Sequence, residues 1–142
     1  MIEKWKQIYK AHEEIINYLI VGVLTTLVSW TAKFIAAIFL DAEIFWQNMA
    51  LSGINWTAGV IFAYFTNRKF VFKSTEKDQM KEAAKFVASR VSTLLLDMFD
   101  MFLMVQILGW DFVFSTLVSA VLVTIANYVF SKLFVFNKKQ EE

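Results

Sequence analysis

The sequence predicts an all-α membrane protein in which four transmembrane helices form two hairpins, with both chain termini in the cytoplasm. The chain has 142 residues, of which 58% are apolar and none is proline. A soluble domain of this size has too little interior to bury so much apolar surface, so part of it must face lipid. An internal repeat predicts the arrangement in two hairpins, and the grouping of basic residues into three segments predicts their orientation.

Four apolar stretches are long enough to cross a bilayer as helices, which takes about 20 residues each. They are Ile16–Leu40, Gln47–Thr66, Phe86–Leu108 and Phe112–Ser131. Backbone polar groups in lipid must bond within their own segment, and these stretches alternate too weakly for barrel strands, so helices are expected. The first stretch is too long for a signal peptide and no cleavage site follows it, so we expect it in the mature chain.

The positions of lysine and arginine predict the orientation. Two short connections, DAEIFWQ and GWDF, contain neither residue. The three basic segments hold Lys4, Lys6 and Lys10; Arg68, Lys69, Lys73, Lys77, Lys81 and Lys85; and Lys132, Lys138 and Lys139. Because positive charge is retained on the cytoplasmic side, both ends and the central segment are expected inside the cell.

Five segments follow from this pattern. Residues 1–14 form an N-terminal amphipathic segment that suits a helix lying in the membrane interface; a basic start that only sets orientation is the alternative. The other four are a first hairpin at 15–72, a cytoplasmic loop at 73–85, a second hairpin at 86–136 and a charged tail at 137–142.

The repeat is clearest at the ends of the two hairpins. YFTNRKFVF at residues 64–72 matches YVFSKLFVF at 128–136, and YLIVGVLTTLVS at 18–29 matches FVASRVSTLLLD at 86–97. We call the segments ending in Phe-Val-Phe the first and second tags. Since both hairpins begin inside, an axis along the membrane normal would relate them, which makes the repeat a parallel one.

These segments resemble the GtrA family, including its GtcA-like branch linked to teichoic acid glycosylation. The resemblance covers almost the whole chain, and the tag N-[RK]-x-aromatic-V-F is its most specific part. It implies small four-helix proteins of the bacterial cytoplasmic membrane, proposed to flip or present polyprenyl-phosphate-linked sugars. By resemblance, the functional positions are Asn67, Arg68, Val71 and Phe72 of the first tag, Arg90 at the start of the third span and Asn127 in the last span. We expect Ala63, Val71, Phe72 and Phe136 to serve the packing of the motif. The two halves differ, because Ser131 replaces Asn67 and Ala63 replaces Asn127.

Ionisable residues inside the predicted spans point to a polar interior. Arg90, Asp97 and Asp100 share one stripe of the third span with Thr93, and such a costly stripe should not face lipid. Lys33 in the first span reaches a comparable depth or a little further out, where pairing with Asp97 or Asp100 is geometrically possible. The alternative is that these charges hold the bundle together or that Lys33 extends to the outer interface.

The predicted site has two parts. Arginine forks and lysine point charges suit phosphate oxygens, and amides add donors. The lipid-phosphate part comprises Arg90, Asn67, Arg68, Lys69, Asn127 and Lys132; the polar path for a sugar comprises Asp97, Asp100, Lys33, Thr93 and Asn55. For the tag cations, topology and attraction to anionic lipid is the alternative. The tag aromatics Phe70, Phe72, Phe134 and Phe136 are more typical of interface anchors than of ligands.

The sequence contains no pattern that indicates an enzyme. It has no cysteine and one histidine, and we find no nucleophile with a base, no metal cluster and no glycine-rich nucleotide loop. No cofactor, metal or nucleic-acid partner is expected.

The function expected from the resemblance is flipping of a polyprenyl-phosphate-linked monosaccharide for glycosylation of surface polymers. Its partners would be that lipid substrate, membrane lipids and a second copy of the chain, because four short helices enclose little volume. An alternative is a membrane anchor that recruits a glycosyltransferase through STEKDQMKEAAK. A proton-coupled exporter using Asp97 or Asp100 ranks third, because that class usually carries its acid in the first helix.

Overall fold

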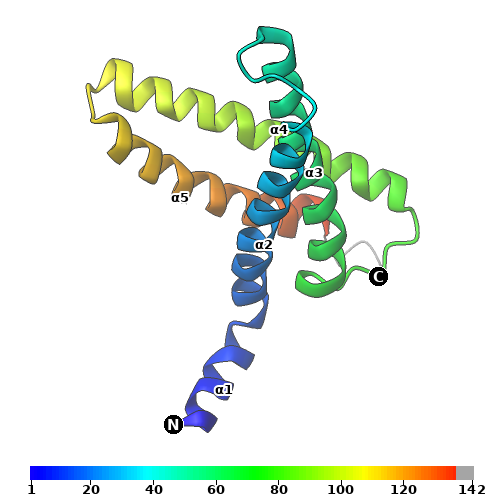
Figure 1. The fold of residues 1–142 in the computed structure, drawn as a ribbon. Helices are drawn as coiled ribbons and strands as arrows, with labels where there is room; N and C mark the ends of the chain where they lie inside the picture. Colours follow the sequence, from blue (N-terminus) through cyan, green and yellow to red (C-terminus); the bar gives the residue numbers. More distant parts are fainter. Residues whose placement is uncertain (137–142) are drawn as a thin grey trace. The chain divides into compact units, whose positions relative to one another are not determined.

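A computed structural model describes residues 1–136, and every regular element among them is helical. The chain separates into two compact units, Met1–Ser74 and Thr75–Glu142. Each unit contains a pair of long helices that run side by side, as Figure 1 shows for α2 with α3 and for α4 with α5. The predicted charged tail at 137–142 lies outside the described residues.

The first hairpin consists of α1 (Ile2–Ala11), α2 (Glu13–Ala36), α3 (Phe45–Thr66) and the π-helical turn η1 (Asn67–Val71). Glu13 and Glu14 open α2, where the positive end of the helix dipole favours acids. The helix ends at Ala36, before the predicted Leu40, and a turn stabilised by Asp41 follows. The Asp41 carboxylate accepts a hydrogen bond from the Glu43 backbone N–H at 2.9 Å.

The second hairpin consists of α4 (Gln79–Met101), η2 (Phe102–Ile107), α5 (Phe112–Phe130) and η3 (Ser131–Val135). The helix α4 begins within the segment predicted as a loop, seven residues or two turns ahead of the expected start (86 − 79). Asp78 explains this difference, because its carboxylate caps the helix by accepting from the Lys81 N–H at 3.1 Å. Asp111 caps α5 in the same way, at 3.0 Å from the Phe114 N–H.

The two tags have the same structure. In each tag a π-type turn replaces the last α-helical turn, and its closing bond joins Phe72 N–H to Asn67 C=O at 2.9 Å and Phe136 N–H to Ser131 C=O at 2.8 Å. The turn directs the last phenylalanine back toward the start of the hairpin. The internal repeat read from the sequence is therefore present in the backbone geometry of both units.

An aromatic pair closes each hairpin. Tyr18 and Phe72 have ring centroids 6.5 Å apart, and the matching pair Phe86 and Phe136 lies at 6.0 Å with nearly the same tilt. Phe72 and Phe136 are buried, whereas their tag neighbours Phe70 and Phe134 are exposed. The four tag aromatics therefore differ in their surroundings: Phe72 and Phe136 pack inside the hairpins, whereas the exposed Phe70 and Phe134 suit interface anchoring.

Two of the helical stretches are long and apolar enough to cross a membrane on length and composition alone. These are Glu13–Ala36 and Phe112–Val135. The helix α3 is comparable in length, and α4 carries Arg90, Asp97 and Asp100 among its apolar residues. The spans predicted for α3 and α4 stay predictions.

Gly59 determines how closely α2 and α3 approach each other. A Cβ atom placed on Gly59 would collide with the Ser29 hydroxyl, whereas one on Gly53 of the same helix meets nothing within 4 Å. We expect Gly59→Ala to leave the purified protein about 1 kcal/mol less stable than Gly53→Ala does, because the Ser29 hydroxyl has to rotate away from the added methyl group. Gly53→Ala is the matched control and should be neutral or gain up to about 1 kcal/mol from helix propensity. Thermal unfolding in detergent measures both, and equal effects would contradict the close approach.

Candidate lipid-phosphate and sugar site

A line of buried polar side chains runs along the contact between α4 and α5. Its members are Ser89, Thr93 and Asp100 of α4 and Ser115, Ser119 and Ser131 of α5 and η3, all of them buried, together with the partly buried Asp97 and Asn127. We call these eight residues the polar seam. Polar groups usually mark the inside of a helix pair in lipid, because hydrocarbon offers them no hydrogen-bond partner.

Hydrogen bonds between the helices hold the seam together. Thr93 donates its hydroxyl hydrogen to Asn127 Oδ1 at 2.6 Å, and Ser119 Oγ lies within hydrogen-bonding distance of both Asp97 Oδ1 and Asp100 Oδ1. The stripe of Asp97, Asp100 and Thr93 predicted from the sequence thus faces the partner helix.

Arg90 stands one turn beyond Phe86, at the cytoplasmic end of the predicted third span. The side chain is partly buried, and its guanidinium carbon lies 4.6 Å from the centre of the Phe86 ring. Stacking on an aromatic face suits the flat arginine fork and leaves its N–H groups at the rim available for other partners. Arg90 is thereby fixed next to the aromatic pair that closes the second hairpin.

The tag cations rest on neighbouring groups of their own tags. Arg68 donates to Ser74 Oγ at 3.5 Å, Lys69 lies 5.3 Å from the Phe70 ring centre, and Lys132 lies 5.6 Å from that of Tyr128. Arg68 and Lys69 belong to the first unit, and Arg90 and Lys132 belong to the second. Their assembly into one lipid-phosphate site stays a prediction.

The two predicted amide donors differ in their surroundings. Asn67 is 1% exposed and donates to the Ala63 carbonyl at 2.7 Å, so its amide supports the junction of α3 and η1. Ala63 and Val71 are buried beside it. Asn127 is partly buried and accepts from Thr93. Both amides therefore have a structural role in this geometry. The sequence alone did not distinguish such a role from ligand binding.

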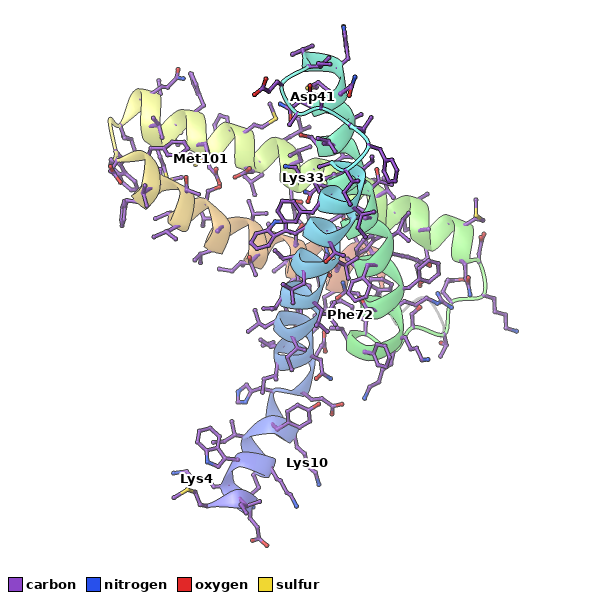
Figure 2. All side chains as sticks on the ribbon, viewed as in Figure 1. Lys4, Lys10, Lys33, Asp41, Phe72 and Met101 are labelled. Carbon is purple, nitrogen blue, oxygen red and sulfur yellow. The ribbon has the colours of Figure 1, made fainter. Side chains whose placement is uncertain are left out.

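The first hairpin contains a less polar version of the seam. In the repeat, Ser29 and Asn55 hold the positions of Asp97 and Ser119, so this hairpin has no acid there. The Asn55 carbonyl oxygen is buried and has no hydrogen-bond partner among the described residues. Lys33 lies in the last turn of α2, toward its connection with α3 (Figure 2), where a lysine readily reaches the interface. Its pairing with an aspartate of the other hairpin stays a prediction.

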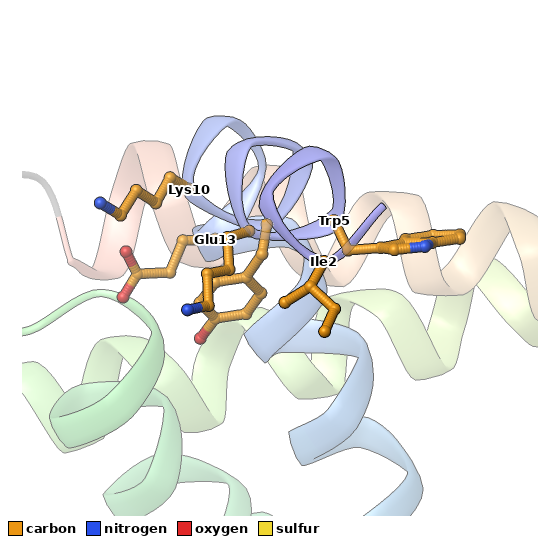
Figure 3. A pocket seen from close by; sticks show the side chains of 6 residues that line it. Ile2, Trp5, Lys10 and Glu13 are labelled. Atoms are coloured by element: carbon orange, nitrogen blue, oxygen red, sulfur yellow. The ribbon is translucent and has the colours of Figure 1, made fainter.

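The start of the first hairpin carries a separate pocket. Figure 3 shows it on α1, lined by Ile2, Trp5, Lys6, Tyr9, Lys10 and Glu13. No residue of α1 is buried, as expected for a helix whose apolar face meets lipid. Two interactions connect the start of this hairpin, one to α2 and one to the residue that follows the first tag. Tyr9 donates to Asn17 at 2.9 Å, and Lys73 forms an ion pair with Glu13 at 3.0 Å.

The sequence analysis missed Ser115 and Ser119. Both lie on one face of the most apolar helix, four residues apart, and serines in such a setting are equally typical of close helix packing. The sequence alone therefore gives no signal that distinguishes these two serines from packing residues. Within residues 1–136, no group of three potential metal ligands is present.

The fold and the seam define the class: a small helical membrane protein whose polar groups face the inside of its helix pairs. The chain belongs to the family described as GtrA/DPMS, transmembrane domain, whose model matches residues 17–136. This membership makes it a membrane protein and confirms the resemblance noted in the sequence.

Three relatives are similar over most of their length. Proteins named cell wall teichoic acid glycosylation protein GtcA, from Listeria monocytogenes and Listeria innocua, are each 34% identical over 129 residues, covering 89% of this chain and 86% of theirs. The uncharacterized membrane protein YwcD of Bacillus subtilis is 30% identical over 128 residues, covering 88% of this chain and 98% of its own. No solved structure matches.

Proposed function

We propose that the protein moves a polyprenyl-phosphate-linked monosaccharide across the bacterial cytoplasmic membrane, for glycosylation of a cell-surface polymer such as teichoic acid. The observation that carries this proposal is the polar seam with Arg90 near one end. Four spanning helices with both termini in the cytoplasm belong to the proposal. The names of the Listeria relatives support the connection with teichoic acid.

The seam offers separate places for the parts of such a lipid. Seven residues separate Arg90 from Asp97 (97 − 90), which is about 10 Å along a helix and suits a phosphate joined to one sugar. The guanidinium would hold the phosphate at headgroup depth, and Asp97, Asp100 and Thr93 would accept or donate hydrogen bonds to sugar hydroxyls. Relocation needs no bond to break, so a non-enzymatic role suffices. A homodimer belongs to the proposal as well, because four short helices enclose little volume for a sugar.

Reconstitution tests this function directly. Purified protein in vesicles containing a labelled polyprenyl-phosphate sugar should raise the fraction of label that reacts with an impermeant external probe, compared with protein-free vesicles. An unchanged fraction with folded protein would overturn the proposal. Under the alternative, recruitment of a glycosyltransferase, charge reversals at the exposed Lys77 or Lys81 would reduce glycosylation in cells, whereas the vesicle assay would show no movement.

The orientation can be tested separately, because the chain has no cysteine. We expect Ala42→Cys in the first connection to react with an impermeant thiol reagent in intact cells. Met80→Cys, whose parent side chain is 82% exposed at the start of α4, should react only after the cells are opened. Both changes leave the charge pattern intact. Labelling of Met80→Cys from outside would reverse the orientation derived from the basic residues.

A further inference from the structure

Ser119 lies between two carboxyl groups. Its hydroxyl oxygen is 2.7 Å from Asp100 Oδ1 and equally within hydrogen-bonding distance of Asp97 Oδ1. Asp97 and Asp100 are three residues apart on one face of α4, and Ser119 projects from α5. Ser119 is 1% exposed and Asp100 is 7% exposed, so the contact lies deep between the helices.

Counting hydrogens shows that this arrangement is incomplete when both acids are ionised. A serine hydroxyl has one hydrogen and can donate it to only one of the two carboxyl oxygens. The other contact would then bring oxygen lone pairs together at close range. One carboxylic acid proton resolves the conflict, because that acid donates to Ser119 Oγ while Ser119 donates to the second carboxylate.

Two further polar atoms of the seam are buried. Asp100 Oδ2 and Ser115 Oγ are both buried without a hydrogen-bond partner in the described part of the chain. Ser115 is fully buried and lies one turn before Ser119 on the face of α5 that packs on α4. Asp100 therefore keeps an unused acceptor within the acid pair, and Ser115, one turn away along α5, keeps an unused hydroxyl.

Within the described part of the second hairpin, no cation lies against the two acids. On α4 the nearest basic side chain is Arg90, about 10 Å along the helix from Asp97. Three elements pack against α4. The helix α5 contains one ionisable group, Tyr128, and η3 contains Lys132, whereas η2 contains no charged side chain. Within the described part of this hairpin, neither aspartate forms an ion pair. The contact with Ser119 is therefore the feature that the two carboxyl groups share within this hairpin.

We infer that Asp97, Ser119 and Asp100 form a proton-binding site in which the two carboxyl groups share one exchangeable proton. The first hairpin has no equivalent, since Ser29 and Asn55 replace Asp97 and Ser119 there, so each chain carries one such site. The site would couple proton movement to relocation of the sugar lipid; this consequence, unlike the site itself, rests on the proposed function.

Infrared spectroscopy of the purified protein in lipid vesicles tests the site without any transport. At neutral pH the wild-type protein should show a protonated carboxyl band that shifts in heavy water. Asp97→Asn and Asp100→Asn should each abolish this band, because the amide donates to Ser119 in place of the acid and the remaining carboxylate ionises. Ser119→Ala should shift the band. Asp111→Asn, at the α5 cap, is the matched control and should leave the band unchanged.

Two outcomes would overturn the inference. One is the absence of a protonated carboxyl band from folded wild-type protein at neutral pH. The other is persistence of the band in both folded asparagine variants. Absence of the band from the folded wild-type protein is decisive even if a variant fails to fold, because this outcome needs no variant. If the protein shows the protonated carboxyl band but moves no sugar lipid, the proposed function is overturned and the proton site still stands.

Coupling between proton movement and relocation of the sugar lipid is measured separately. In vesicles that move the labelled lipid, an imposed pH gradient should accelerate movement by the wild-type protein and leave movement by folded Asp97→Asn insensitive to the gradient. Equal acceleration of both proteins would show that the proton site is not coupled to relocation.

Discussion

Arg90→Lys is expected to reduce sugar transfer to the surface polymer by about ten- to a hundredfold at normal protein abundance. This range follows from the loss of about 1.5–3 kcal/mol for a hydrogen bond to a charged group. Lysine keeps the positive charge, and with it the orientation and the attraction to anionic lipid. It loses the flat fork that stacks 4.6 Å from the Phe86 ring centre and can hold two phosphate oxygens together.

The measurement is glycosylation of the polymer in cells that carry only the variant, with protein level checked by immunoblot. Lys81→Arg is the control, because it makes the opposite exchange at an exposed position in the first turns of the same helix. Wild-type glycosylation by Arg90→Lys would mean that this cation acts through charge alone, and the lipid-phosphate role would have to be abandoned.

Removal of the last aromatic ring of either tag is expected to destabilise its hairpin strongly. Phe72→Ala and Phe136→Ala delete rings that are 3% and 5% exposed, so each should cost about 3–5 kcal/mol. The loss separates the π-type turn from the start of the hairpin, where Tyr18 and Phe86 receive these rings.

Phe70→Ala and Phe134→Ala are matched controls, since each removes the same ring two residues earlier in the same tag. These side chains are 52% and 63% exposed and should cost far less. Thermal unfolding in detergent compares the four variants. Similar losses at buried and exposed positions would contradict the aromatic closure of the hairpins.

The candidate site was only partly predictable from sequence. The spacing of Arg90, Asp97 and Asp100 along one helix is local information, because helical geometry places residues three, four and seven apart on one face. Ser119 carries no comparable local signal. Its role arises from the register between α4 and α5, which places one hydroxyl between two carboxyl groups.

The tags illustrate a second difference. Both contain alternating aromatic residues, and membrane-interface anchoring is a sound expectation for all of them. A π-type turn accommodates one more residue per turn than an α-helix and so rotates the last phenylalanine inward. Helix propensity along the sequence does not predict this turn, because the turn is stabilised by the packing of its last phenylalanine on a ring at the start of the hairpin.

The sequence by itself determined the helical class, the repeat of two hairpins, the family and the ionisable stripe of α4. Each of these depends on composition, period or motif spacing along a continuous segment. Only the tertiary structure decided which tag aromatics are buried and that Ser119 joins Asp97 to Asp100. These features depend on contacts between residues far apart in the chain, and a difference of one residue in helix register would change all of them.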